Sequence, residues 1–175
     1  MIVLDKDGDM MKIVVVSDSH GRNDLLCDLV LKHPDADAFL HCGDIEYEAE
    51  SFPEYIVVQG NNDYFYDIPA QRILPFGKHR ILLIHSHQLS YRKREEQLIA
   101  YAKEHNCDIV CYGHTHVAEY RKENGIVLLN PGSLKYSRDG RDPSYAILTI
   151  DDDYVDAKIV FLQQHKSKHG FFFRR

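Results

Sequence analysis

Short apolar runs alternate with polar loops along the chain, and their spacing predicts both strands and helices. Residues 12–16 and 108–112 are continuous aliphatic runs rich in β-branched residues, which is typical of buried strands. Residues 72–76 and 79–85 flank Gly77-Lys78 and predict a hairpin. Further strands are expected at residues 37–42, 55–59, 118–122, 126–130, 144–150 and 154–162.

Two segments carry apolar residues at helical spacing. The first contains Leu26 and Leu29, with Asn23 as the expected N-cap and Pro34 ending the helix. The second, residues 92–105, is charged and amphipathic. Strand–helix units come first and hairpins later, so we expect an α/β or α+β domain in which two mixed sheets pack together with helices outside.

Composition narrows the class of protein. A length of 175 residues fits one domain, which we place at residues 12–162, between an N-terminal extension (1–11) and a basic, aromatic tail (163–175). The net charge of −6 argues against an extended nucleic-acid surface, and no apolar run is long enough to predict contact with a membrane. Four cysteines without a CxxC pair, and no signal-peptide pattern, predict a reducing, cytoplasmic setting.

Five polar clusters each follow an apolar run. They are Asp18-Ser19-His20, Gly43-Asp44, Gly60 to Asp63, His85-Ser86-His87 and Gly113 to His116. The carboxyl ends of buried strands are where open α/β sheets place their ligand sites. Residues two apart point to one side of an extended backbone, so each pair in a DxH or HxH triplet is expected to chelate from one edge. Gly-Asp and Gly-Asn alone are ordinary turn dipeptides, but five such clusters at strand ends indicate a shared site.

The order of these clusters, with the later Asn130-Pro131-Gly132-Ser133, resembles the calcineurin-like metallophosphoesterase superfamily. It is most similar to the small single-domain YfcE-type phosphodiesterases, over roughly residues 12–162. The resemblance implies a four-layer fold in which two packed mixed β-sheets are flanked by helices. It also implies hydrolysis of phosphate esters at a dinuclear metal site, with a bridging hydroxide as the nucleophile.

The ligands that the resemblance implies are carboxylates, imidazoles and one amide. Asp18, His20 and His116 would hold the first metal, Asn61, His85 and His114 the second, and Asp44 would bridge both. This donor set suits transition metals better than Mg or Ca. Two divalent ions are therefore expected, Mn first, with Fe, Zn or Ni as alternatives.

One position departs from the pattern of the superfamily. Many members carry a histidine after Gly-Asn as the general acid, whereas this chain has Asn62, which cannot donate a proton in that role. We consider His87 as a replacement donor; a role in supporting the ligands, or exposure without a role, is an equal alternative. Asp63 is expected to orient a ligand or its loop by hydrogen bonding.

The predicted function is that of a metal-dependent phosphodiesterase acting on small phosphodiesters. A phosphomonoesterase of the same fold is the nearest alternative, and a non-catalytic scaffold similar to a retromer subunit is the second. Competent residues fill every ligand position, which favours an enzyme. Family members often form homo-oligomers, so one is an open expectation here. Among other residues, His33, His79 and His105 are expected at the surface, His41 beside the ligands or in the core, and Ser133 and Arg138 as candidates for substrate contact.

Overall fold

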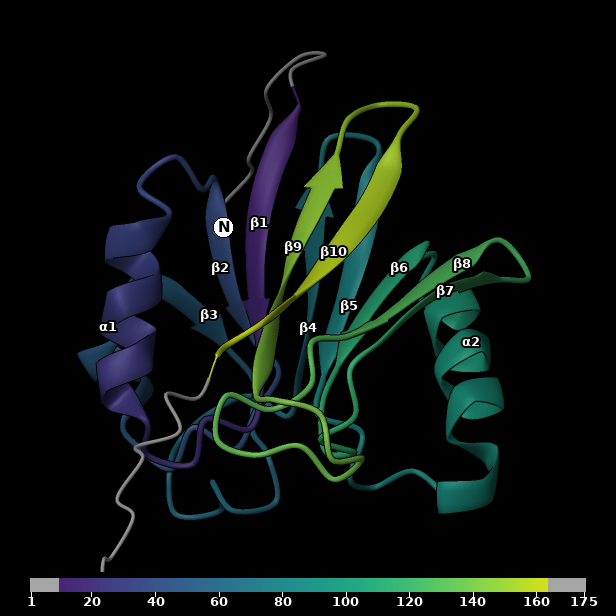
Figure 1. Ribbon diagram of the computed structural model, residues 1–175. Coiled ribbons are helices and arrows are strands. Elements are labelled where there is room, and N and C mark those ends of the chain that lie inside the picture. The colour runs from purple at the N-terminus through teal and green to yellow at the C-terminus, as the bar shows by residue number, and fades with distance from the viewer. Residues whose placement is uncertain (1–9, 164–175) are drawn as a thin grey trace, which may run out of the picture.

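The computed structural model describes residues 10–163, which form two five-stranded sheets packed face to face (Figure 1). The first sheet has the order β10-β9-β1-β2-β3. Its strands are β1 (Met11–Val16), β2 (Ala38–His41), β3 (Tyr55–Val57), β9 (Ser144–Ile150) and β10 (Val155–Phe161). β2 runs parallel to both β1 and β3, whereas β9 is antiparallel to β1 and β10, so this sheet is mixed.

The second sheet has the order β4-β5-β6-β8-β7 and is also mixed. Its strands are β4 (Gln71–Phe76), β5 (His79–Ile84), β6 (Ile109–Tyr112), β7 (Glu119–Glu123) and β8 (Ile126–Asn130). β5, β6 and β8 are parallel, while β4 and β7 pair antiparallel at the two edges. The hairpin expected around Gly77-Lys78 is the β4–β5 connection.

Two α-helices cover the outer faces of the sheets (Figure 1). α1 (Asn23–Lys32) lies beside the first sheet and α2 (Arg94–Glu104) beside the second. Short 3-10 turns, η1 (Ala49–Ser51) and η2 (Tyr91–Lys93), complete the elements. Asn23 was wrongly expected to cap α1: it is the first helical residue, and Arg22 occupies the cap position without a side-chain hydrogen bond.

Side-chain alternation along β1 divides the apolar core into layers. Ile13 and Val15 face the core between the two sheets, and Val14 and Val16 face the α1 side. A third cluster joins α2 to the outer face of the second sheet. Helix, sheet, sheet and helix therefore stack in the four layers that the sequence predicted.

The boundaries of the domain differ slightly from expectation. β1 begins at Met11, which is buried in the central core, so this residue belongs to the fold and not to the extension. The rest of the expected extension, residues 1–9, and the basic, aromatic tail from residue 164 lie outside the described residues. Within residues 10–163, neither α-helix combines the length and apolar character of a membrane-spanning helix.

Candidate metal centre

The five polar clusters lie at the same end of the molecule. They follow β1, β2, β3, β5 and β6, which run parallel within their respective sheets. The connecting loops gather at the lower end of Figure 1. Residues separated by about a hundred positions in the chain therefore meet at one edge of the sandwich, as strand ends in open α/β sheets do.

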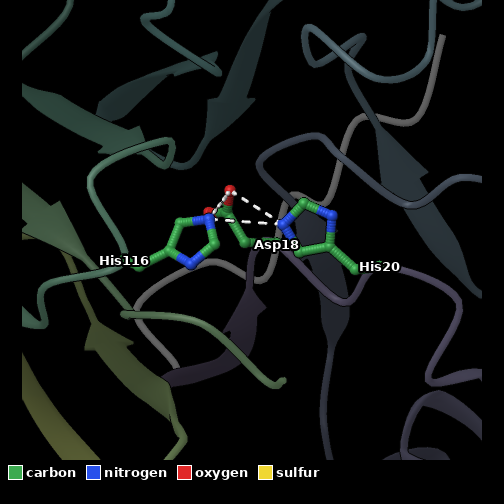
Figure 2. Close-up of side chains that lie close together, drawn as sticks. All are labelled: Asp18, His20 and His116. Atoms are coloured by element: carbon green, nitrogen blue, oxygen red, sulfur yellow. Dashed lines mark hydrogen bonds and ion pairs between the residues drawn. The ribbon is translucent and has the colours of Figure 1, made fainter. Parts of the chain in front are cut away.

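Asp18, His20 and His116 form the first group of candidate ligands (Figure 2). His116 Nε2 lies 3.0 Å from Asp18 Oδ1 and 3.3 Å from His20 Nε2. The two imidazole rings turn these nitrogens toward each other beside the Asp18 carboxylate. Two ring nitrogens and a carboxylate oxygen at this separation can share one cation.

Asn61, His85 and His114 form a second group. Asn61 Oδ1 lies 3.2 Å from His85 Nε2 and 3.0 Å from His114 Nδ1. Asp44 lies between the groups, with Oδ2 3.5 Å from His85 Nε2 and 3.9 Å from His20 Nε2. The structure therefore brings together all seven side chains that the sequence proposed as ligands, and places Asp44 where it can contact both groups.

Hydrogen bonds on the outer nitrogens orient three of the histidine rings. Nδ1 of His20 lies 2.7 Å from Glu46 Oε1, Nδ1 of His85 lies 2.7 Å from the Cys42 carbonyl, and Nδ1 of His116 lies 3.1 Å from the Tyr136 carbonyl. Oxygen acceptors require the proton on Nδ1, which leaves the Nε2 lone pair aimed at the centre. This is how proteins usually fix the tautomer of a histidine that binds a metal.

The Asp18 carboxylate provides a direct test of whether the site fits a cation. Oδ2 accepts from Ser17 Oγ at 2.6 Å and from the His114 backbone N–H at 3.0 Å. Oδ1 is buried, forms no hydrogen bond of good geometry within residues 10–163, and faces His116 Nε2 at 3.0 Å. With the His116 proton on Nδ1, two lone pairs would face each other here, which is costly, and a metal ion between them removes that cost. The donor set and this pair of facing acceptors both fit divalent transition metals.

The charges of the site favour ionised carboxylates. Burial alone raises the pKa of Asp18, but its interactions with His116, His85 and Ser17 together outweigh burial and lower it to about 2. Burial raises the pKa of Asp44, but the hydrogen bond and charge of His85 together with the Asn62 backbone N–H outweigh burial, so the pKa is also lowered. Burial, followed by the charges of His85 and Arg94, lowers the pKa of His114 to about 4. Charged carboxylates beside a neutral His114 are the forms that bind cations. Burial lowers the pKa of His85, but Asp44 and Asp18 outweigh it and raise the pKa, so His85 must release a proton before its Nε2 can bind a metal.

The ligand loops adopt left-handed backbone conformations. Asp18, His20, His114 and His116 have φ angles of 50°, 45°, 71° and 58°. The expectation that these pairs lie on extended backbone is therefore wrong. The side chains still converge, because the loops after β1 and β2 stay side by side, with the Asp18 N–H bonded to the Gly43 carbonyl and the His20 N–H to the Asp44 carbonyl. Positive φ is unfavourable for non-glycine residues and is commonly concentrated at functional sites.

Two positions in the clusters require glycine, because the backbone there passes very close to other side chains. A Cβ atom added at Gly113 would lie 2.0 Å from Ser17 Oγ, and one at Gly60 would lie 2.1 Å from Asp44 Oδ1. Both distances are far shorter than van der Waals contact. Only glycine allows these loops to pass so close to the candidate ligands.

Asp63 is fully buried and accepts hydrogen bonds from the backbone around Asp44. Its carboxylate receives the N–H groups of Asp44 at 2.7 Å, Glu46 at 2.7 Å and Gly60 at 2.8 Å, with Ile45 at 3.3 Å. These bonds join the loop after β2 to the loop after β3. Asp63 therefore acts on the centre by positioning Asp44.

Asn62 and His87 lie on different sides of the centre. Asn62 donates from its backbone N–H to Asp44 Oδ1 at 2.8 Å and from Nδ2 to Glu46 Oε1 at 3.0 Å. The His87 ring is 5.4 Å from the His85 ring and 6.3 Å from that of His114, between centroids. His87 Nδ1 is buried without a partner in the described chain, so this residue is not simply exposed. Burial, followed by the charge of His85, lowers the pKa of His87.

Sequence reasoning missed Glu46 as a contributor to the centre. It orients His20 and receives Asn62, although it lies only two residues beyond Asp44. Glu46 has a φ angle of 56°, like its neighbour Asp44 at 57°. The signal available in the sequence was the acidic residue in Gly43-Asp44-Ile45-Glu46, but a lone glutamate in a loop is too common to single out.

His41 supports the ligand loops from within the core. It is completely buried, its Nδ1 accepts from the Gly43 N–H at 3.1 Å, and its Nε2 lies 2.9 Å from Ser19 Oγ. Burial lowers the pKa of His41 to about 3, so it is neutral at ordinary pH. The sequence left two positions open for His41, in the core or beside the ligands. The structure shows both features, because the residue is buried and contacts the ligand loops.

Two expectations for residues outside the ligand set are wrong. Ser133 is buried and donates to the Asp18 carbonyl at 2.8 Å, so it braces a ligand loop instead of meeting substrate. Asn130 similarly donates to the Gly113 carbonyl at 3.2 Å. His33, expected at the surface, is only 7% exposed because it packs on Tyr145, with Nε2 3.0 Å from the hydroxyl.

Comparison with known proteins agrees with this geometry. The family model of the calcineurin-like phosphoesterase superfamily domain matches residues 11–153. The chain is 34% identical over 146 residues to the probable metallophosphoesterase YsnB of Bacillus subtilis, covering 82% of this chain and 86% of that protein. A crystal structure of a predicted phosphoesterase from Streptococcus pneumoniae superimposes with a TM-score of 0.82 at 30% identity, covering 87% of this chain and 90% of that one.

The YfcE phosphoesterase of E. coli shares the fold with a TM-score of 0.60 at 20% identity, over 83% of this chain and 91% of that chain. The chain therefore belongs to the calcineurin-like phosphoesterase superfamily, and the resemblance carried by its motifs is confirmed. It is accordingly a metal-dependent phosphoric ester hydrolase in class, with candidate ligand groups for divalent cations.

Proposed function

We propose that this protein hydrolyses small phosphodiesters at a dinuclear site, with manganese as the preferred ion. The observation that carries the proposal is the convergence of the seven candidate ligands, five of them in two groups that share Asp18 and the other two in contact through Asn61 Oδ1. When bound, two divalent ions supply a hydroxide nucleophile at neutral pH and neutralise charge on the phosphoryl oxygens. The chain itself holds the ligands in place and fixes their protonation.

Charge favours a diester over a monoester. Two divalent ions bring four positive charges, and Asp18, Asp44 and a hydroxide remove three of them, so the loaded site carries about one positive charge. A diester has one negative charge at neutral pH, whereas a monoester has close to two. The diester therefore leaves the site near neutrality, and the monoester leaves it with excess negative charge beside Glu46.

Asn62 supports the same preference. Its amide can donate hydrogen bonds to an anionic oxygen but cannot transfer a proton. Its Nδ2 lies 3.3 Å from Asp44 Oδ2, so the amide lies beside the carboxylate between the two ligand groups. Leaving-group protonation then depends on another donor, for which His87 is the candidate within the described chain.

The chemistry sets limits on the partners of the protein. We propose small-molecule substrates in the cytoplasm, and not extended nucleic acid or a membrane surface. The acidic balance of the chain supports this, because a positive field is expected only at the loaded centre. A homo-oligomer stays a prediction from the resemblance alone.

The proposal is tested with two substrates that share one leaving group: 4-nitrophenyl phosphate and its methyl diester. Both are measured with the manganese-loaded protein, and the nitrophenolate released reports kcat/KM. We expect the diester to have the higher kcat/KM by about 10-fold or more, a difference of about 1.4 kcal/mol in transition-state stabilisation.

Two outcomes would decide between the alternatives. A higher kcat/KM for the monoester would overturn the diester preference while keeping the enzyme class. Failure to retain metal together with failure to hydrolyse either ester would favour the non-catalytic scaffold. The Asp18→Asn variant is the matched control, since it keeps the size of the ligand side chain and is expected to abolish both reactions.

A further inference from the structure

A cavity of about 660 Å³ opens beside the candidate metal centre. His114 belongs to its wall, so the cavity begins where the second group of ligands ends. It extends past Tyr112 toward Tyr91 and the first residue of α2, Arg94. Its volume is within the range of small-molecule sites, and it is large enough for the part of a substrate that lies beyond the reacting phosphate.

Arg94 is a buried cation in the wall of this cavity. It is only 9% exposed, and its Nε is buried without a hydrogen-bond partner among residues 10–163. The guanidinium carbon lies 6.0 Å from the centre of the Tyr91 ring, which holds it in place. Buried charges are costly unless they are paired, and no ion pair of Arg94 is found within residues 10–163, so an anion in the cavity beside this guanidinium would compensate its charge.

Arg138 brings a second guanidinium to the same cavity. It donates from Nη1 to the His114 carbonyl at 3.0 Å, which anchors it next to a candidate ligand. Burial is the main cause that lowers the pKa of Arg94, and the charge of Arg138 adds to it. Two cations in the wall of one cavity favour a bound anion there.

The two acidic residues of the cavity wall, Glu95 and Glu119, already have partners. Glu95 and Glu119 both form ion pairs with Arg121, which is not part of the wall. Glu119 also accepts from the Tyr112 hydroxyl at 2.7 Å. These carboxylates are thus turned toward their own partners, whereas the Arg94 Nε has none in the described chain.

We propose that this cavity, with Arg94 and Arg138, binds a second anionic group on the substrate, separate from the phosphodiester that reacts. The inference rests on the proposed function and narrows it to phosphodiesters that carry a further phosphate or carboxylate on the ester group beside His114. Guanidinium groups bind phosphate and carboxylate through paired N–H donors, and Arg94 and Arg138 both line this cavity. Binding energy from this remote group positions the reacting phosphate.

The kinetic test uses two nucleotide diesters that differ only in the second anion. Thymidine 5′-(4-nitrophenyl phosphate) is compared with the same compound carrying a 3′-phosphate, on manganese-loaded protein. We expect the 3′-phosphate to raise kcat/KM by about 10-fold or more, and Arg94→Gln to remove that advantage. Arg94→Lys keeps the charge and should restore part of it, and Arg138→Gln tests the second cation on a different loop.

A control variant and a binding measurement make the result independent of turnover. Arg80→Gln removes a charge from an exposed residue at the opposite end of β5 and should leave both substrates unaffected. On protein stripped of metal with EDTA, calorimetry should detect thymidine 3′,5′-bisphosphate more readily than thymidine. Arg94→Gln should weaken that binding by about 10-fold, and Arg80→Gln should not.

The two arms separate failure of this inference from failure of the proposed function. If neither diester is hydrolysed but the bisphosphate still requires Arg94, the phosphodiesterase proposal fails and the anion site stands. If both diesters are hydrolysed with equal kcat/KM and Arg94→Gln changes neither, the anion site is wrong and the phosphodiesterase proposal stands. Equal binding of the bisphosphate to wild-type and Arg94→Gln protein would also overturn the anion site.

Discussion

Single residues at the centre divide into those that face the metals and those that hold them in position. Asp18 directs Oδ1 toward the Nε2 of His116 while Oδ2 is fixed by Ser17 and His114. The residue types of the ligands could be read from the sequence because histidine and aspartate pairs are distinctive. The positioning role of Glu46 could not, because its importance comes from a contact with His20, which lies 26 residues earlier in the chain.

Asp63→Asn tests positioning at the residue scale. An asparagine has one acceptor oxygen, so at least one of the four backbone N–H groups bonded to Asp63 would face an amide N–H. We expect a loss of about 2–3 kcal/mol in the free energy of unfolding and about 10- to 100-fold in metal affinity. Denaturant titration and metal binding measure these effects. Asp67→Asn, at an exposed position, is the control, and an equal effect in both variants would contradict the role.

His87→Ala tests proton donation. If His87 protonates the leaving group, the variant should lose about 100-fold in kcat on methyl phenyl phosphate, a poor leaving group, and far less on methyl 4-nitrophenyl phosphate. Gln88→Ala, at the exposed neighbouring position, controls for the loop. An unchanged kcat on the poor leaving group would leave His87 as a residue that packs against the ligand rings.

At the scale of elements, the strands were predictable and the loops between them were not. β8 and β9 match their expected bounds, because apolar runs of strand length at 126–130 and 144–150 are unambiguous. The loops after β1 and β6 carry non-glycine residues at positive φ, which local propensity disfavours. Their conformation is imposed by contacts between distant segments, such as Ser133 on the Asp18 carbonyl and Asn130 on the Gly113 carbonyl.

Gly113→Ala tests the close approach of the loop after β6 to the loop after β1. Its Cβ would overlap Ser17 Oγ, so the loop must move. We expect a loss of about 1–3 kcal/mol in the free energy of unfolding together with weaker metal binding. Gly125→Ala is the matched control, because a Cβ there meets nothing within 4 Å. Its positive φ should cost about 1–2 kcal/mol without changing metal affinity. Normal metal affinity in Gly113→Ala would contradict the account.

Over the whole molecule, the layered architecture followed from the alternation of apolar residues, whereas several burial assignments did not. His33 follows α1 and has no apolar pattern of its own, so nothing in the sequence indicated that Tyr145, 112 residues away, would cover it. Its environment depends on β9 returning to the first sheet, which is a feature of the tertiary fold.

The burial of His33 predicts how stability varies with pH. Burial, followed by the charges of Lys12 and Lys32, lowers the pKa of His33 below its ordinary value of 6.5. The unfolded chain therefore binds a proton that the folded chain resists, so its stabilising contribution is complete above about pH 6.5 and declines as pH falls below it. The slope is at most about 1.4 kcal/mol per pH unit.

Urea unfolding in EDTA at about pH 7.5 and pH 5.5 checks this dependence. His33→Gln removes the titrating group, so the difference in unfolding free energy between the two pH values should shrink. Tyr145→Phe keeps the histidine buried and removes only its hydroxyl partner, so it should retain the pH dependence. An identical difference in wild type and His33→Gln would show that other groups cause the decline.

The most direct test of the central claim is the number of metal ions that each chain retains. Wild-type protein is stripped with EDTA, reconstituted with Mn²⁺, desalted and measured by mass spectrometry of the metal. A dinuclear phosphoesterase centre predicts about two ions per chain, with clear loss in Asp44→Asn because Asp44 lies between both ligand groups. Retention of no ion by the wild type, or equal retention by Asp44→Asn, would contradict the account.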